Sequence, residues 1–522
     1  MALQRPKLLL KRFSRPRQEE TPNEKQTPQK KPVEASYIEQ RKPREDELAL
    51  GFEYVAEDEE RGRWLLTGIK QNERLVHFYI VGASGSGKTK FMQYLIKQDI
   101  ANQNGFGVID PHGDLIEDIK GWLYLESTKD LQKDVVLLDP ADSKKTAVFN
   151  PIEQIEGETA GDQAGKLMIA FDKIWHEFFG PRMENILRNS LIALCEAGLT
   201  IAEVPLLLMN ADFRQKVLEK VEEPNCRRYF LQEFETLSSH TRREYTESTL
   251  NKINALLSRE RIRQILSARK SSFDLREIMD KQKILLVNLN KGRLGDTGDL
   301  LGSLLMSRIQ MAAFSRTDMP ERKRTPFYLY IDEFQNFASE NFISVLSEAR
   351  KYGLSLILAH QNLAQLPRSL QSSIITNCGV QTYFRLSRTD ADILAREGFR
   401  VSGLVVKYMN IGADSVSPVY ETLQEEREKQ IQGLQDLPRQ FCFAVNKNQS
   451  SRAGLQVPPV PKPWQAAGKD ADDFEEMVQK AEIGKGYLVP RGKIEKECRK
   501  RQEELTKHED PDTFRDTKRE NT

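Results

Sequence analysis

The sequence predicts an α/β protein with a largely parallel sheet that is interrupted by an all-helical insertion. Short apolar runs alternate with helical patterns, a glycine-rich loop follows the first of these runs, and the middle of the chain repeats only at helical spacing. We therefore expect a disordered basic arm at 1–48, the two parts of the α/β domain at 49–154 and 281–450, the helical domain at 155–280, and a Pro-containing linker with a charged, mostly disordered tail at 451–522.

The glycine-rich loop lies in RLVHFYIVGASGSGKTKFMQYL, between an apolar run and an amphipathic stretch. It fills the pattern G-x-x-x-x-G-K-[ST], in which backbone N–H groups and the positive end of the next helix bind phosphate. Lys88 is expected to reach the β- and γ-phosphates and Thr89 to hold Mg2+. The expected phosphate-binding residues are Gly82, Ala83, Ser84, Gly85, Ser86, Gly87, Lys88 and Thr89. The sequence therefore predicts a site for ATP and Mg2+.

Further strands are expected at GVIDPHGDL, DVVLLDP, KILLVNLNKG, FYLYIDEF, LSLILAHQ, GVQTYFRL and QFCFAVNK. Ligands of open α/β sheets bind at the carboxyl ends of the strands, where Asp110 and Asp139 are expected. His112 lies in a glycine turn, where a structural role is the simpler interpretation.

The strand FYLYIDEF ends in two adjacent carboxylates. Asp332 is expected to bind Mg2+, and Glu333 to orient and deprotonate an attacking water. Gln361 closes the run LSLILAHQ, which should lie beside this strand, and its amide is expected to sense the γ-phosphate or position the water. The alternatives are a capping role for the two carboxylates and, for Gln361, an amide that caps a helix or is satisfied in the core.

An arginine is still needed, because ATPases that work as rings commonly complete each site with an arginine from the neighbouring subunit. The candidates are Arg350, after the FYLYIDEF strand, and Arg385 and Arg388, after the GVQTYFRL strand. Each has an alternative interpretation as a surface ion-pair partner.

Charge is unevenly distributed along a chain whose formal net charge is only +1. Residues 1–44 hold 12 lysines and arginines against 5 glutamates, so this arm is either a solvated tail or a contact for nucleic acid or anionic lipid. A second basic run comprises Arg259, Arg261, Arg263, Arg269 and Lys270, and either forms a solvated face or touches DNA.

The five cysteines are scattered, which fits buried thiols in a reducing cytosol. No apolar run approaches 18 residues. We therefore expect a cytoplasmic protein with no membrane span of its own, one that reaches the inner membrane only through partners.

The order of motifs carries a resemblance. RLVHFYIVGASGSGKT, IDPHGDL, FNPI, GPRMENILRNSL, LLVNLNKGRLG, YIDEFQNF, EARKYGLSLILAHQ and TNCGVQTYFRL follow one another over about residues 60–450. In this the chain resembles the type IV secretion coupling proteins of the TraG/TraD kind, within the FtsK/HerA class of ring-forming motor ATPases. Many of those proteins begin with membrane-spanning helices, whereas this sequence begins with a polar basic arm.

The resemblance implies a RecA-like motor domain, a homo-hexamer with ATP at the subunit interfaces, and DNA as the translocated substrate, with relaxosome or secretion-channel proteins as partners. It assigns phosphate binding to Gly82 through Thr89, the Mg2+ carboxylate to Asp332, catalysis to Glu333 and the sensor role to Gln361. The alternatives are a secretion or pilus-assembly ATPase that handles protein, a HerA-like DNA-processing translocase, and a non-hydrolytic DNA or relaxosome adaptor.

Overall fold

The computed structural model describes residues 43–506 except 45, 57–61, 127–133, 141–143, 177–178, 339–341, 412–415 and 482. The expected basic arm lies almost entirely outside the described residues. The chain divides into two compact units. Unit 1 comprises 1–106, 117–127 and 326–476, and unit 2 comprises 107–116, 128–325 and 477–522. The unit boundaries thus differ from those expected from the sequence, because the helical segment shares a unit with strands of the α/β part.

Unit 1 is built on a sheet whose strands lie in the order β2-β1-β14-β13-β10-β3-β9-β8. The strands β10, β3, β9 and β8 are parallel neighbours, and the pairs from β10 to β13, β14, β1 and β2 are antiparallel. The bounds are β1 Glu47–Ala56, β2 Gly62–Lys70, β3 Phe78–Val81, β8 Phe327–Ile331, β9 Leu354–His360, β10 Val380–Tyr383, β13 Phe441–Asn446 and β14 Ser451–Gln456.

The four parallel strands are buried along their whole length, which explains why the sequence shows them as continuous apolar runs. The antiparallel strands β1, β2 and β14 alternate more and carry charged residues, so the apolar pattern alone did not predict them. Strand β3, with its glycine-rich loop, lies in the interior of the sheet of unit 1, between the parallel strands β10 and β9, and the antiparallel strands extend the sheet beyond β13.

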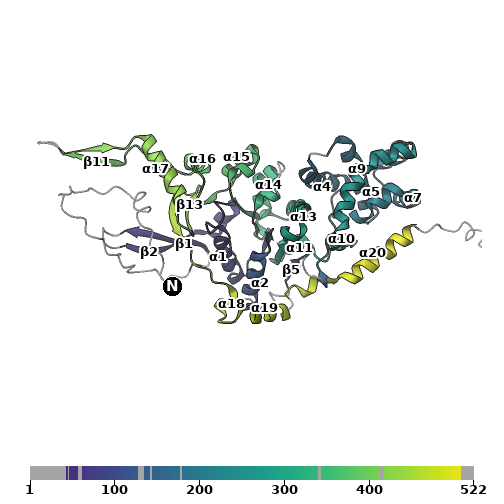
Figure 1. The fold of residues 1–522 in the computed structure, drawn as a ribbon, viewed down its shortest axis with the longest axis horizontal. Helices are drawn as coiled ribbons and strands as arrows, with labels where there is room; N and C mark the ends of the chain where they lie inside the picture. The colour runs from purple at the N-terminus through teal and green to yellow at the C-terminus, as the bar shows by residue number, and fades with distance from the viewer. Residues whose placement is uncertain are drawn as a thin grey trace, which may run out of the picture. The chain divides into compact units, whose positions relative to one another are not determined.

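Helices and one hairpin complete unit 1. The hairpin consists of β11 Val406–Ile411 and β12 Val416–Tyr420 and forms a separate two-stranded sheet, which extends from α17 in Figure 1. The helices are α1 Lys88–Ala101, α14 Phe342–Glu348, α15 Arg368–Asn377, α16 Arg388–Gly398, α17 Leu423–Gln435 and α18 Pro463–Ala466, with 3₁₀ turns η2 Gln71–Val76, η8 Phe334–Asn336, η9 Ala349–Tyr352 and η10 Leu363–Gln365. Helices α2 Asp114–Glu126 and α19 Ala471–Lys480 are shared between the two units.

Unit 2 combines strands in the order β4-β7-β5 with a helical body. Strands β5 and β7 are parallel, and between 160 and 280 the described residues form helices and turns only. The bounds are β4 Phe106–Asp110, β5 Val135–Leu138, β6 Lys145–Thr146, β7 Ile284–Asn288, β15 Val489–Pro490, α4 Ala160–Trp175, α5 Pro181–Glu196, η4 Ile201–Glu203, α6 Val204–Met209, α7 Ala211–Leu218, α8 Pro224–Arg228, the π-helix η5 Tyr229–Phe234, α9 Ser239–Ser258, α10 Glu260–Leu266, α11 Leu275–Asp280, α12 Lys291–Leu294, α13 Asp296–Phe314, η6 Ser315–Asp318, η7 Glu321–Lys323, η11 Lys485–Tyr487 and α20 Arg491–Thr506.

The C-terminal region differs from the expected disordered tail. Residues 451–456 form β14, and α20, yellow in Figure 1, contacts α7 and α10. Ile494 and Cys498 are buried on one face of α20, and Arg501 forms an ion pair of 2.6 Å with the fully buried Glu203. Charged residues outnumber apolar ones on this helix, so composition masked a face that packs. Residues 507–522 lie outside the described part.

The predicted fold class is confirmed: the protein is a mixed α/β protein with a largely parallel sheet and a helical segment within it. All five cysteines are buried and free. Among the described helices, none combines the length and apolarity that crossing a membrane requires.

Candidate functional site

The glycine-rich loop joins β3 to α1 within unit 1. Helix α1 begins at Lys88, and its N-cap Gly87 has no side chain to satisfy the first N–H groups. Such groups bind anions readily. The buried Lys88 Nζ donates hydrogen bonds to the carbonyls of Gly82 (2.7 Å) and Ala83 (3.3 Å), so the amine folds over the loop. The buried Ser86 hydroxyl has no hydrogen-bond partner within the described part of the chain, and a phosphate oxygen would supply one.

Glycine is required in this loop for two different reasons. A Cβ on Gly82 would lie 2.5 Å from Phe384 Cβ, and one on Gly87 would lie 3.0 Å from Gln440 Cα. Gly85 and Gly87 also have positive φ values of 71° and 120°, which side chains disfavour. Beside Gly85 there is open space, so the loop leaves room for a ligand where it faces outward.

Asp332 follows the end of β8 and reaches the loop. Thr89 Oγ1 lies 3.4 Å from Asp332 Oδ2, and the carboxylate is buried. Neighbouring ligands in an octahedral Mg2+ shell lie about 3 Å apart, so a hydroxyl and a carboxylate at this distance fit one Mg2+. Burial lowers the pKa of Lys88, while the carboxylates of Glu333 and Asp332 raise it and so support the ammonium form.

Glu333 is held by two amides. Its Oε1 accepts a hydrogen bond from Gln361 Nε2 (2.9 Å) and its Oε2 one from Gln335 Nε2 (2.7 Å). The strand β9, which Gln361 follows, lies beside β8 as the sequence predicts. Sequence reasoning missed Gln335, although it lies only two residues beyond Glu333.

A buried ion pair links α1 to the strand that carries Asp332. Arg74 donates to both carboxylate oxygens of Asp99 on α1 (2.6 and 2.8 Å) and to Tyr330 Oη on β8 (2.9 Å). Tyr330 in turn donates to Asp99 (2.5 Å), and all three side chains are almost completely buried. These contacts fix the helix after the phosphate loop against β8. No sequence pattern predicts this set, because Arg74, Asp99 and Tyr330 lie far apart along the chain.

The three candidate arginines have different surroundings. Arg350 is exposed on η9, which precedes β9, whereas the phosphate loop lies at the other end of this seven-residue strand. At about 3.3 Å per residue the two are roughly 20 Å apart, so Arg350 does not reach the loop of its own chain. Arg385 is exposed beside the loop, where its carbonyl accepts from Ala83 N (2.8 Å). Arg388 forms an exposed ion pair with Glu428.

The two carboxylates of unit 2 that were expected at strand ends, Asp110 and Asp139, have hydrogen-bond partners within the protein. Asp110 caps α2, since its carboxylate accepts from the N–H groups of His112 (2.8 Å), Leu115 (2.9 Å) and Ile116 (3.3 Å). Asp139 follows β5 and accepts from Asn288 Nδ2 (3.3 Å). The side chain of His112 is exposed, and the residue contributes its backbone N–H to the carboxylate of Asp110.

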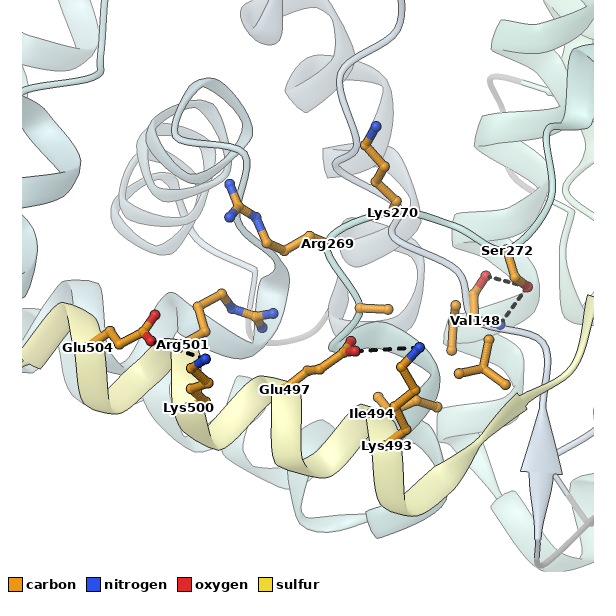
Figure 2. Close-up of a pocket in the computed structure, with 12 residues that line it drawn as sticks. Val148, Arg269, Lys270, Ser272, Lys493, Ile494, Glu497, Lys500, Arg501 and Glu504 are labelled. Carbon is orange, nitrogen blue, oxygen red and sulfur yellow. Dashed lines mark hydrogen bonds and ion pairs between the residues drawn. The ribbon is translucent and has the colours of Figure 1, made fainter.

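The basic run of unit 2 contacts mainly the protein itself. Arg259, Arg261, Arg263 and Arg269 donate to the carbonyls of Arg293, Pro140, Leu257 and Gly198, respectively. Arg269 and Lys270 also line a cavity of about 520 Å³ whose other wall is α20 (Figure 2). In that wall Lys493 pairs with Glu497 and Lys500 with Glu504, so the cavity is not uniformly cationic.

The fold and the loop together define a RecA-like P-loop protein. The family model of the type IV secretion-system coupling protein DNA-binding domain matches residues 67–393. The chain therefore belongs to this family of type IV secretion coupling proteins.

Two solved structures of a conjugative coupling protein show the same fold, and a third structure is similar to the chain. The bacterial conjugative coupling protein TrwBΔN70, in its unbound monoclinic form, has a TM-score of 0.51 at 15% identity, covering 76% of this chain and 88% of that one. Its trigonal form in complex with sulphate has a TM-score of 0.50 at 15% identity, with 76% and 89% covered. VirB4 of Thermoanaerobacter pseudethanolicus has a TM-score of 0.46 at 12% identity, with 82% and 99% covered. Among curated proteins, none matches this chain.

Proposed function

We propose that this chain is an ATP-dependent DNA-translocating motor of the coupling-protein type, which hydrolyses ATP at the subunit interfaces of a homo-hexameric ring. One observation carries the proposal. The phosphate loop, Asp332 and the Glu333–Gln361 pair meet at the carboxyl ends of the parallel strands of unit 1. DNA as the cargo rests on the matched family, whose description names a DNA-binding domain.

In the proposed reaction each side chain has a separate task. Lys88 and the N–H groups at the start of α1 bind the phosphates, and Thr89 and Asp332 hold Mg2+. When bound, Mg2+ supplies positive charge to the phosphate oxygens. Glu333 orients the attacking water and accepts its proton, and Gln361 and Gln335 hold the carboxylate in position.

The proposal includes a ring because none of the three candidate arginines, all within the described residues, lies beside Glu333 and Gln361 of its own chain. Arg350 lies at the opposite end of β9, a position from which it serves only a neighbouring subunit's site. Arg385 and Arg388 are exposed and remain candidates of the same kind. Relaxosome or secretion-channel partners and a cytoplasmic location stay predictions of the sequence.

The test is the rate of phosphate release by the full chain with Mg2+ and ATP, without DNA and with single- or double-stranded DNA. The oligomeric state is measured on the same sample by light scattering. We expect hydrolysis that DNA stimulates several-fold in an oligomeric fraction. A rate of hydrolysis that DNA does not change would favour a motor for protein cargo. Nucleotide binding without any phosphate release would favour a non-hydrolytic adaptor. Either result overturns the proposal.

A further inference from the structure

The groups expected to act in hydrolysis lie on one side of the phosphate loop. In unit 1 the strand β3, which leads into the loop, has β9 and then β8 on one side and β10 and then β13 on the other. Gln361 follows β9, and Asp332 and Glu333 follow β8. The hydrolytic end of a nucleotide on this loop therefore points toward β9 and β8, and its other end points toward β10 and β13.

On the β10–β13 side, the turn before β13 is fixed against the loop. Gln440 N donates to Ser86 O (2.8 Å), and Gln440 O accepts from Val457 N (2.9 Å). Gln440 has a φ of 64°, and its Cα occupies the space that a side chain on Gly87 would need. The backbone of this turn thus forms a wall of the loop, which places the preceding residue, Arg439, beside the start of α1.

Arg439 adds a positive charge near the first turn of α1, close to Lys90 and Lys462. Its side chain is exposed, and among the described residues it has no hydrogen bond or ion pair. Arg439 lies close enough to Lys90, on the first turn of α1, to help lower the pKa of that lysine. Burial is the largest cause of the lowered pKa, Asp118 opposes it, and Lys462 acts in the same direction as Arg439. The carboxylate of Asp118 already pairs with Lys90 (4.0 Å) and Lys462 (2.9 Å), so the positive charge of Arg439 is the one left to attract an anion.

We propose that Arg439 binds the α-phosphate end of the nucleotide, the half that also carries the ribose and base. The proposal rests on the proposed function, because it takes the loop as a nucleotide site. Lys88 and the carboxylates lie toward the terminal phosphates, and Arg439 and Gln440 lie toward the opposite end. Because ADP and ATP share that end, the contact contributes to the affinity of both and adds nothing specific to the transition state.

The test compares Arg439→Ala with the unchanged chain in binding of fluorescent ATP and ADP analogues and in steady-state hydrolysis. We expect about a tenfold loss of affinity for both nucleotides, a matching increase in KM, and an unchanged kcat. Arg439→Lys should recover part of the affinity. Arg400→Ala removes an exposed arginine from another loop of unit 1 and serves as the matched control.

Three results are decisive. Unchanged ADP and ATP affinity in Arg439→Ala, with an unaltered melting temperature, overturns the inference. A reduced kcat at saturating ATP with unchanged affinity also overturns it, because that pattern assigns Arg439 to the chemical step. An unchanged chain that binds neither nucleotide contradicts the proposed function itself, and so separates the two failures.

Discussion

Glu333 is positioned by neutral amides, and this choice of partner suits a proton acceptor. The Gln361 and Gln335 amides each donate one hydrogen bond to the carboxylate, which fixes the direction of its two oxygens. Glu333 also has a left-handed φ of 45°, which a residue with a side chain rarely adopts. The backbone therefore turns sharply after Asp332 to aim the next carboxylate at β9.

At this scale we expect Glu333→Gln to bind ATP normally and to hydrolyse it at least about 100-fold more slowly, since removal of a general base costs that much. Phosphate release and analogue binding measure the two effects. Glu348→Gln, an exposed glutamate of the same unit, is the control and should hydrolyse normally. Hydrolysis by Glu333→Gln at the original rate would remove Glu333 from the mechanism.

His77 predicts a pH dependence of stability. Its Nδ1 accepts from Leu356 N (3.1 Å), its Nε2 faces Leu346 O (3.1 Å), and burial lowers its pKa to about 4. The unfolded chain binds the proton near pH 6.5, so this stabilisation is complete above pH 6.5 and is lost as the pH falls toward 4. The melting temperature should fall over this window.

The measurement is the melting temperature between pH 4 and 8. His77→Asn cannot titrate and should give a shallower fall, with the remaining slope due in part to His360, whose pKa burial also lowers to about 4. His112→Ala removes an exposed histidine and should leave the curve unchanged. Parallel curves for His77→Asn and the unchanged chain would contradict the assignment.

At the scale of elements, the contact between α1 and β8 decides whether the two halves of the site meet. Arg74, Asp99 and Tyr330 join the helix after the phosphate loop to the strand that ends at Asp332. A buried ion pair of this kind is costly to break, because removal of one partner leaves an uncompensated charge. It also has a fixed geometry, which suits two elements that must present groups to one ligand.

We expect Asp99→Asn to lower the free energy of unfolding by about 3–5 kcal/mol, because Arg74 keeps its buried charge without a counter-charge. Urea unfolding followed by circular dichroism gives the value. The matched control is Asp392→Asn, which breaks an exposed pair with Arg396 and should cost no more than about 1 kcal/mol. Similar losses in both variants would show that the buried pair has no special weight.

At the scale of the whole molecule, the sheet of unit 1 separates Arg350 from the loop of its own chain. Strand β9 has Arg350 before its first residue and Gln361 after its last. In a closed ring every subunit presents both ends to its neighbours, and each interface can combine a loop from one copy with an arginine from the next.

A mixing experiment tests this arrangement. Lys88→Ala and Arg350→Ala should each be inactive alone, because one lacks phosphate binding and the other lacks the arginine. Mixed in equal amounts and reassembled, they should recover hydrolysis at roughly a quarter of the interfaces, where an intact loop meets an intact Arg350. Activity in Arg350→Ala alone, or no recovery on mixing, would direct the search to Arg385 and Arg388.

By itself the sequence determined the strands of the parallel sheet and the phosphate loop, because buried strands are continuous apolar runs and the loop needs glycines at set positions. It also placed Gln361 beside the Asp332 strand, since neighbouring parallel strands end at the same edge. Each of these features is set by a few consecutive residues, and a sequence pattern can therefore predict it.

Only the tertiary structure decided which distant groups share one environment. The pairing of Arg74 with Asp99 and Tyr330, the addition of β14 to the sheet, the packing of α20 against Glu203 and the position of Arg439 beside Lys90 all join residues far apart along the chain. Composition made α20 appear to be a charged tail, because a few buried residues and one buried ion pair change the average very little. The energy of such contacts depends on burial and distance, which the order of residues alone does not specify.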